Sequence, residues 1–509
     1  MMELKAYRGH IRNHRALCAE LGISGELSRE EREKEILCRG YEKWGTDLPE
    51  HLYGMFAFAI EDGDKTICFR DHFGTKPFYY ALSGGKLLYG TMIRDIIDTE
   101  GFEKELNLPL LQIYLSLTYP AGEETFFKGV KKLMPGHYLV YENGKVTVTR
   151  YWTPEFHPDD SKTAEEWADE IHETLKQMMY EVKTDDETAE SFLSGGVDSS
   201  YVLAMSDAKR ANSCGYDEER FDESRVAAKT AEILGVEHSV AKITPEQFFE
   251  VVPYVMKNME QPLGDASAIV FTLGCLATAK HTKLCYSGEG ADEFFGGYNM
   301  YRNAERYGDE LRNFYVGNTN IMKEDEKKRL LLSYDPEVLP IDLVKHIYDE
   351  TEGLDPLTKM SDVDIQIWLE GDIYLNVDKM STAAGLEVRM PLTDRRVFDI
   401  ASRMPSRFKV TEEQNKVAFR MAAAKVLPEE IAFRKKLGFI VPIRLWLADE
   451  RYNGDVRRLL NSDIAAKFFN TDELSAIYIE YINGNSDLWR KIWTVYTFLV
   501  WYEEYFIRR

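Results

Sequence analysis

Two glycine-rich loops carry the residues of this chain whose types and spacing suit chemistry. The first runs Ser194-Gly-Gly-Val-Asp-Ser-Ser200 and follows a short apolar strand. Its glycines let an anion approach the backbone, while its serines and the start of the next helix supply donors. Because Asp198 would repel a bare phosphate, the loop predicts a phosphate chain bound with Mg²⁺ on this carboxylate. The expected phosphate ligands are Ser194, Gly195, Gly196, Asp198 and Ser199.

The same loop has a simpler interpretation. A Gly-Gly turn followed by a helix with a capping serine would use the same residues without binding any ligand. The loop also lacks the Gly-Lys-Ser/Thr end of a Walker motif. Taken alone it favours neither interpretation, and the remainder of the chain decides between them.

The second loop runs from Ser287 to Tyr298, with the sequence Ser-Gly-Glu-Gly-Ala-Asp-Glu-Phe-Phe-Gly-Gly-Tyr. Its carboxylates are Glu289, Asp292 and Glu293. Acidic residues beside glycines usually form a solvated turn. Here they follow an apolar strand, residues 284–286, so we expect them at the mouth of a cleft.

The elements that must position these loops form an alternating pattern. Thr163-Ala-Glu-Glu166 predicts a capping box at the start of a helix, and from there to about residue 300 strands alternate with helices, which predicts a parallel α/β sheet. The predicted strands end at Leu193, Cys214-Gly215 and Tyr286. Both glycine-rich loops would then lie at the carboxyl ends of parallel strands, where such sheets bind ligands. Residues from about 340 onward are predicted to be mostly helical.

The front of the chain is predicted to be β-rich. A hairpin centred on Asn143-Gly144 is expected, with helices at Asn13–Leu21 and Arg29–Trp44 and with Asn13 as an N-cap. Prolines and acidic residues between 151 and 162 break any regular element. We therefore expect a first domain at residues 1–155 and a second at 156–509.

Composition limits the partners. The 509 residues carry a formal charge of −23, which argues against nucleic acid or an anionic membrane as a partner. The six cysteines are scattered without a C-x-x-C pair, and the N-terminus has no apolar export segment. A cytoplasmic location is expected, and a homodimer is compatible with the sequence.

The two loops together resemble the asparagine synthetase B family of ATP pyrophosphatases. That family combines Ser-Gly-Gly-x-Asp-Ser with a later Ser-Gly-Glu-Gly-x-Asp-Glu, and the likeness extends over nearly the whole chain. It implies an α/β protein with an N-terminal Ntn-hydrolase-like, glutaminase-type β-rich sandwich. The C-terminal synthetase domain would be adenine-nucleotide α-hydrolase-like, a parallel sheet with a helical C-terminal part, and would use ATP and Mg²⁺.

The resemblance also implies roles for residues. Asp198 and Asp292 would hold Mg²⁺ on the pyrophosphate, beside Ser287 and Gly288. Glu289 would take a proton from the attacking amine, and Lys436, in the loop Phe433–Phe439, would stabilise the charge on the adenylate. Without the resemblance, Lys436 would be interpreted as part of an exposed basic loop. The substrate-side candidates are Asp265, Ser267, Asp372 and Asp378.

The front domain departs from the family. The family nucleophile is a cysteine directly after the initiator Met, whereas residue 2 here is Met. The family's glutamine-gripping strand, Tyr-Asn-Gly-Glu-Ile-Tyr-Asn, is replaced by Tyr7-Arg-Gly-His-Ile-Arg-Asn13. Glu33 stands where the family has the Asp that binds the glutamine amine. We therefore expect a degenerate glutaminase domain.

The expected function is an ATP-dependent, AMP-forming amide ligase that does not hydrolyse glutamine. It would join the carboxylate of a small molecule or peptide to an amine, either as an ammonia-dependent asparagine synthetase or as a specialised synthetase. The alternatives are an intramolecular cyclase of the lasso peptide or β-lactam type and an inactive ATP-binding homologue. The β-lactam formers carry Tyr at the position of Glu289, which weakens that alternative. No nucleic-acid or membrane partner is expected.

Overall fold

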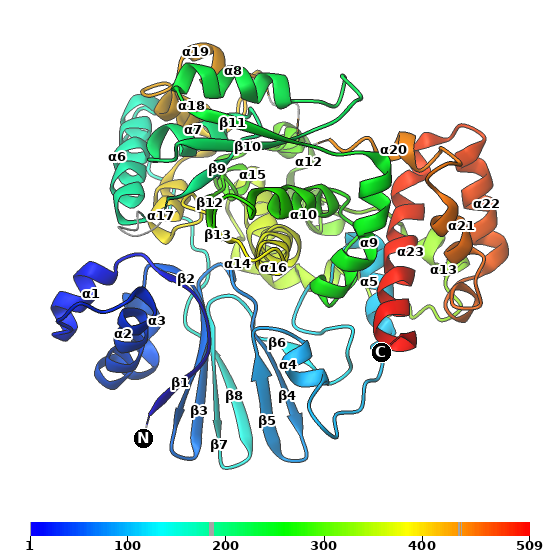
Figure 1. Ribbon diagram of the computed structural model, residues 1–509, viewed down its shortest axis with the longest axis horizontal. Helices are drawn as coiled ribbons and strands as arrows, with labels where there is room; N and C mark the ends of the chain where they lie inside the picture. The colour runs from blue at the N-terminus through cyan, green and yellow to red at the C-terminus, as the bar shows by residue number, and fades with distance from the viewer. Residues whose placement is uncertain (1, 183–187, 436–437, 439, 509) are drawn as a thin grey trace.

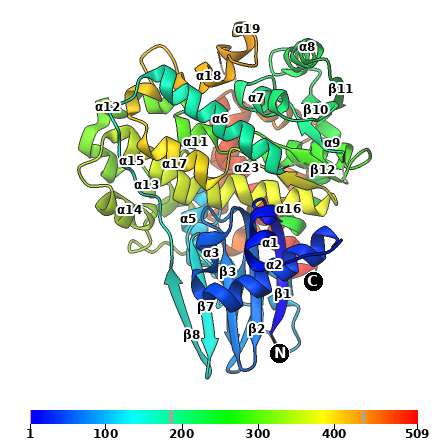
Figure 2. The same cartoon turned by 90° about the vertical axis from the view of Figure 1, so that its left-hand side faces the viewer.

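The computed structural model describes residues 2–182, 188–435, 438 and 440–508, and it confirms the predicted two-part α/β architecture. The strand-rich N-terminal part lies below a larger C-terminal part that contains a parallel sheet (Figures 1 and 2). Residues 151–163 join the two parts and contain no helix or strand.

The N-terminal part is a layered sandwich. Its larger sheet is antiparallel, in the order β1 (Glu3–Ile11), β2 (Gly54–Asp62), β3 (Lys65–Arg70), β7 (His137–Glu142), β8 (Lys145–Arg150). One face packs on α1 (His14–Leu21), α2 (Arg29–Trp44) and α3 (Leu48–His51). The other face packs against the smaller sheet, in the order β5 (Lys86–Gly90), β4 (Tyr79–Ser83), β6 (Lys131–Lys132). The alternation of apolar residues in β2 therefore fills a core on each face.

Two short helices, α4 (Arg94–Ile97) and α5 (Pro109–Leu117), complete this part. The predicted hairpin at Asn143-Gly144 is confirmed, because β7 and β8 pair on either side of it. Asn13 directly precedes α1 as predicted, but its side chain makes no capping hydrogen bond. Its amide instead donates to the His51 carbonyl at 2.9 Å, and its Oδ1 accepts from the Tyr53 N–H at 3.0 Å. The asparagine therefore ties the start of α1 to the chain that enters β2.

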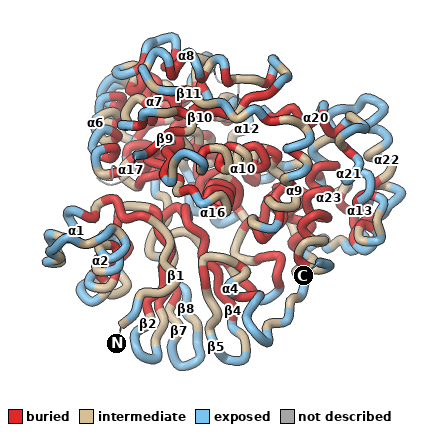
Figure 3. Tube along the Cα trace, in the orientation of Figure 1, coloured by how far each residue is buried: buried red, intermediate tan, exposed pale blue. Residues whose placement is uncertain are grey.

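The C-terminal part is built on a parallel sheet in the order β11 (Glu237–Lys242), β10 (Arg210–Gly215), β9 (Glu190–Phe192), β12 (Leu284–Tyr286), β13 (Glu387–Arg389). The strand predicted to end at Leu193 ends one residue earlier. The helices nearest this sheet are α6 (Ala164–Val182), α7 (Val197–Met205), α8 (Ser224–Leu234), α9 (Pro245–Met259), α10 (Ser267–Thr278), α16 (Leu375–Ala383), α17 (Arg395–Arg403) and α18 (Val417–Ala423). Figure 3 shows the buried trace of the sheet between these helices.

The capping box predicted before α6 is confirmed. The Glu166 carboxylate accepts from the Thr163 N–H at 2.8 Å, and the Thr163 hydroxyl accepts from the Glu166 N–H at 3.3 Å. The apolar stripe of α6 is buried against α17 and α18.

The remaining helices lie beside and beyond the sheet. They are α11 (Ala291–Phe295), α12 (Ala304–Tyr307), α13 (Glu324–Leu330), α14 (Lys345–Glu350), α15 (Pro356–Val363), α19 (Glu429–Ala432), α20 (Ile443–Trp446), α21 (Gly454–Leu460), α22 (Thr471–Ile482) and α23 (Trp489–Tyr502). Between α15 and α16 the backbone winds as a π-helix, Asp364–Tyr374, so that the three helices follow one another without a break.

Ion pairs join the two parts of the chain. We call them the docking ion pairs: Arg8 and Lys76 with Asp378, Arg12 with Asp394, Arg29 with Glu387, Arg70 and Lys132 with Glu370, and Arg94 with Glu260. In each pair the cation belongs to the N-terminal part and the carboxylate to the C-terminal part. The carboxylates of Asp378, Glu370 and Glu260 are at most 2% exposed. Removing a carboxylate that two buried cations share, such as Glu370, leaves both cations without compensation.

We expect Glu370→Gln to lower the free energy of unfolding by about 3–5 kcal/mol, because Arg70 and Lys132 would both stay buried and uncompensated. Urea unfolding followed by tryptophan fluorescence measures this loss. The matched control is Glu350→Gln, which breaks the exposed pair between Arg150 and Glu350 and should cost about 0–1 kcal/mol. Equal stabilities for the two variants would show that the Glu370 cluster adds nothing to docking.

Candidate active site

The two glycine-rich loops lie side by side at the carboxyl ends of neighbouring strands. β9 and β12 pair in parallel, with Glu190 opposite Cys285 and Ser191 opposite Tyr286. Gly288 lies so close to the first loop that a Cβ atom there would be 2.8 Å from the Ser199 nitrogen. Only glycine allows this approach, so the second loop is in backbone contact with the first.

Hydroxyl groups organise the first loop. The Ser199 hydroxyl accepts from the Ser194 N–H at 3.1 Å, and the Gly196 N–H donates to the Ser194 hydroxyl at 3.3 Å. Gly195 has φ +82°, a backbone conformation that favours glycine. The Arg434 guanidinium donates to the Gly195 carbonyl at 2.9 Å and fixes the outer side of the loop. The loop then enters α7, whose N-terminal turn carries Asp198.

A buried lysine joins the two loops. Lys416 Nζ lies 2.6 Å from Asp198 Oδ1 and 2.7 Å from Asp292 Oδ1. The lysine side chain is 2% exposed and the two carboxylates are about 20% exposed, so the cluster opens outward on its acidic side. A Cβ at Gly297 would lie 1.7 Å from Asp292 Oδ1, so glycine is required beside the cluster. The structure thus brings together Asp198 and Asp292, which are 94 positions apart in the sequence.

This pair of carboxylates fits a magnesium ion. Carboxylate oxygens are the ligands that Mg²⁺ takes from proteins, and here two of them already share one cation. The described residues contain no group of three or more His, Cys, Asp or Glu side chains placed to hold a metal. A magnesium ion bound here would therefore complete its shell with phosphate oxygens and water, as is usual at nucleotide sites.

Glu289 is held at both its backbone and its side chain. Its Oε1 accepts from the Ser287 hydroxyl at 3.2 Å, and its carbonyl accepts from the Thr393 hydroxyl at 3.2 Å. The next residue, Gly290, has φ +96° and starts the turn into α11. The Ser287 N–H donates to the Arg389 carbonyl at 2.9 Å, which ties the start of the loop to β13.

Glu293 is the third carboxylate of the second loop. Burial, and after it the charge of Asp292, raises the pKa of Glu293 to about 8. The Tyr298 hydroxyl donates to it, and the Trp368 indole N–H donates to that hydroxyl at 3.1 Å. Glu293 is therefore mostly protonated at pH 7 and adds little charge beside Asp292.

The substrate-side candidates divide into two groups. Asp265 accepts from the Ser267 N–H at 2.9 Å at the start of α10, and Asp372 is buried in the π-helix. Burial, and then the charge of Asp265, raises the pKa of Asp372 well above its usual range. Both carboxylate oxygens of Asp372 lack a hydrogen-bond partner among the described residues. Asp378 instead bonds Lys76 at 2.8 Å in the docking ion pairs and does not join this group.

One predicted site residue and three residues that the sequence analysis did not propose complete the comparison. Lys436 lies outside the described residues. Lys416, Thr393 and Gly297 belong to the site and were not predicted. The contact between Lys416 and Asp198 joins residues 218 positions apart, and no local motif surrounds the lysine.

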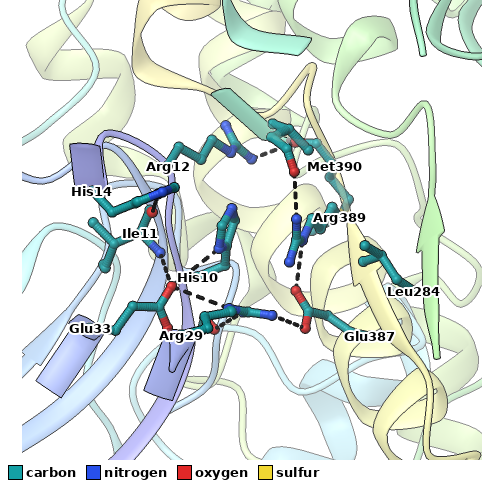
Figure 4. Close-up of polar contacts among 12 residues, drawn as sticks. His10, Ile11, Arg12, His14, Arg29, Glu33, Leu284, Glu387, Arg389 and Met390 are labelled. Atoms are coloured by element: carbon teal, nitrogen blue, oxygen red, sulfur yellow. Dashed lines mark hydrogen bonds and ion pairs between the residues drawn. The ribbon is translucent and has the colours of Figure 1, made fainter. Parts of the chain in front are cut away.

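In the stretch from Tyr7 to Asn13, which differs from the family's glutamine-binding strand, the side chains bond to other residues of this chain. His10 Nδ1 lies 3.2 Å from Glu33, which also accepts from the Ile11 N–H at 3.0 Å (Figure 4). Burial and the nearby arginines, among them Arg29, lower the pKa of His10 well below its usual range, so His10 is neutral. Arg29 bridges Glu33 to Glu387 of β13.

Within the described part of the chain, no helix combines the length and apolar character that a membrane span needs.

The chain is similar to known proteins along its length. The profile of the family described as Asparagine synthase matches residues 156–503, and that of the Glutamine amidotransferase domain matches residues 3–152. The chain is 31% identical to asparagine synthetase (glutamine-hydrolyzing) 1 of Bacillus subtilis, over 97% of this chain and 84% of that protein. It is 25% identical to asparagine synthetase (glutamine-hydrolyzing) 3 of the same organism, over 84% of this chain and 74% of that protein.

Proposed function

The chain belongs to the asparagine synthase family of ATP-dependent carbon–nitrogen ligases, and on this premise we propose that it joins a carboxylate to an amine through an acyl-adenylate, without hydrolysing glutamine. The observation that carries the proposal is the cluster of Asp198, Asp292 and Lys416 between two glycine-rich loops. These loops leave backbone and hydroxyl donors for a phosphate chain beside carboxylates for its metal.

In the first step, a substrate carboxylate oxygen attacks the α-phosphorus of ATP, and the bond to the bridging oxygen breaks to release pyrophosphate. Ser194, Gly195 and Gly196 would bind the departing pyrophosphate, and Lys416 would hold Asp198 and Asp292 in place. A magnesium ion on these carboxylates would offset the charge that develops on the phosphate oxygens. Lys436 remains our candidate for the cation on the adenylate side.

In the second step, the amine nitrogen attacks the acyl carbon and the bond to AMP breaks. Glu289 would accept the proton that the amine loses, and AMP would leave with the electron pair of the broken bond. Ser287 and Thr393 hold this glutamate from its side chain and its carbonyl, which suits a base that must meet a bound adenylate. Asp265 and Asp372 are the candidates for substrate contacts.

The test is pyrophosphate release with a panel of carboxylates, with and without ammonia, followed by mass spectrometry of the products. The proposal requires AMP and amide in equal amounts with at least one carboxylate. Two sets of substrates agree with the proposal. One is aspartate with free ammonia, and the other is a specialised carboxylate with its own amine. ATP binding without any release of pyrophosphate would favour the inactive homologue instead.

The loss of glutamine hydrolysis is proposed from the residues that fill the front domain. Arg8 bonds Asp378 at 2.8 Å and His10 bonds Glu33, so neither position offers a free amide or carboxylate to a glutamine. All six cysteines are described, and burial is the main cause that raises the pKa of each thiol, to about 12 for Cys214. None is an activated nucleophile.

We expect this chain to release no glutamate from glutamine while forming amide product from ammonia or another amine. A coupled glutamate assay measures the release, and Cys18→Ala serves as the control because Cys18 is the cysteine nearest the chain start. Glutamate release by the wild-type chain above that control would show that the front domain still hydrolyses glutamine.

A further inference from the structure

A short segment after β13 connects the N-terminal part of the chain to Glu289. Residues 390–394 leave β13 and lead into α17. On one side this segment contacts Arg12, and on the other its Thr393 hydroxyl donates to the Glu289 carbonyl. The two contacts lie within a few residues of each other, so a shift of one side moves the other.

Arg12 contacts both ends of the segment, and Figure 4 shows its contact with Met390. It follows β1, its side chain is 1% exposed, and its guanidinium lies 2.7 Å from Asp394 Oδ2 and 2.8 Å from the Met390 carbonyl. Burial opposes the charge on Asp394, but Arg12 and Arg396 together lower the pKa of that carboxyl to about 2. The fork of the guanidinium thus spans both ends of the segment, which a single ammonium group could not do.

The segment is packed tightly against the turn that carries Glu289. A Cβ at Gly290 would lie 2.9 Å from the Thr393 hydroxyl, so the chain at Gly290 already touches Thr393. The Thr393 side chain is buried, and its hydroxyl bonds the Glu289 carbonyl, so a movement of residues 390–394 changes this contact. The position of the Glu289 backbone therefore depends on where Arg12 holds this segment.

We infer that Arg12 is a positioning residue for Glu289: the N-terminal part sets the base of the amide-forming step through Arg12 and Thr393. This inference rests on the proposed function, because it assigns the base to Glu289. The front domain would then contribute to the second half-reaction by positioning Glu289, without catalysing a reaction itself. We expect ATP binding at Asp198 and Asp292 to persist when this segment shifts, because Lys416 holds both carboxylates.

The experiment compares Arg12→Met with Arg8→Met. Arg8 lies in β1, just before Arg12 in the chain, and its pair with Asp378 is also a docking ion pair. Each substitution leaves a buried carboxylate with one remaining cation, Lys76 for Asp378 and Arg396 for Asp394. Among the described residues, the hydrogen bonds and ion pair of Arg8 are with Met92, Asp378 and Thr382 and not with residues 390–394, so Arg8→Met controls for loss of docking alone.

The readouts are ATP–pyrophosphate exchange and the ratio of AMP to amide product. We expect Arg12→Met to keep exchange within about twofold and to slow amide formation by roughly 10-fold to 100-fold, because a small misplacement of a reacting group has this cost. The adenylate would then be lost to water, so AMP would exceed amide. Arg8→Met should keep AMP and amide equal, and Arg12→Lys should restore part of the amide yield.

An unchanged ratio in Arg12→Met, or the same rise in Arg8→Met, would overturn the inference. If Arg12→Met does not fold, Thr393→Val decides the question, because it removes the hydroxyl contact to Glu289 and should raise the same ratio. A wild-type chain that forms no adenylate would refute the proposed function, and the inference would be refuted with it. If the wild-type chain forms amide and the variants keep its ratio of AMP to amide, only the positioning role is refuted.

Discussion

Asp198→Asn and Asp292→Asn are each expected to abolish ATP–pyrophosphate exchange while leaving the protein folded. Each substitution removes one carboxylate charge from the pair that Lys416 gathers, and the amide has nearly the same shape. The charge that develops on the pyrophosphate would then lose one of the two carboxylates proposed to hold its magnesium ion. The expected loss is about 10³-fold in rate, or about 4 kcal/mol, by analogy with other groups that stabilise developing charge.

Exchange of labelled pyrophosphate into ATP measures this effect, and circular dichroism checks the fold. Asp309→Asn is a matched control, because the Asp309 side chain is 96% exposed and meets only Lys359 at 3.5 Å. Near-normal exchange in either folded variant would exclude the two-loop magnesium site.

Glu289→Gln should separate the two half-reactions. The amide keeps the hydrogen bond from the Ser287 hydroxyl and the backbone contact to Thr393, but it cannot accept a proton from the amine. Pyrophosphate exchange should therefore stay near normal, while amide formation falls by roughly two to four orders of magnitude. Parallel assays of exchange and of amide product on one preparation give both numbers.

Glu293→Gln is the control for this change. Because the pKa of Glu293 is raised to about 8, that residue is mostly neutral at pH 7, and glutamine replaces it with another neutral acceptor for Tyr298. Its effect on both half-reactions should be small. If Glu289→Gln lowered exchange and amide formation together, Glu289 would belong to the ATP site. If it lowered neither, Asp372 would become the next candidate for the base.

The sequence predicted the fold because its signals are local. The apolar strand at Leu284–Tyr286 and the loop after it follow one another in the chain, and β12 has the predicted bounds. The capping box at Thr163 and Glu166 needs only residues within one turn. Since parallel strands present their carboxyl ends at one edge, the meeting of the two loops also followed from the alternating pattern.

The rest of the site depends on contacts that have no local signature. Lys416 lies in an ordinary stretch before α18, and its role appears only where the chain folds back onto Asp198. Asp378 sits in a motif that the resemblance places near the substrate, yet Arg8 and Lys76 approach it from the front domain. Such partners are set by the docking of two distant surfaces, which neither periodicity nor spacing encodes.

The docking ion pairs have a consequence for how this chain can change in evolution. Their cations come from the N-terminal part and their carboxylates from the C-terminal part, so deleting the N-terminal part would leave Glu370 and Asp378 without these cations on a newly exposed face. Point substitutions at other positions of the N-terminal part leave that arrangement intact. Selection can therefore tolerate substitutions in the N-terminal part more readily than its deletion.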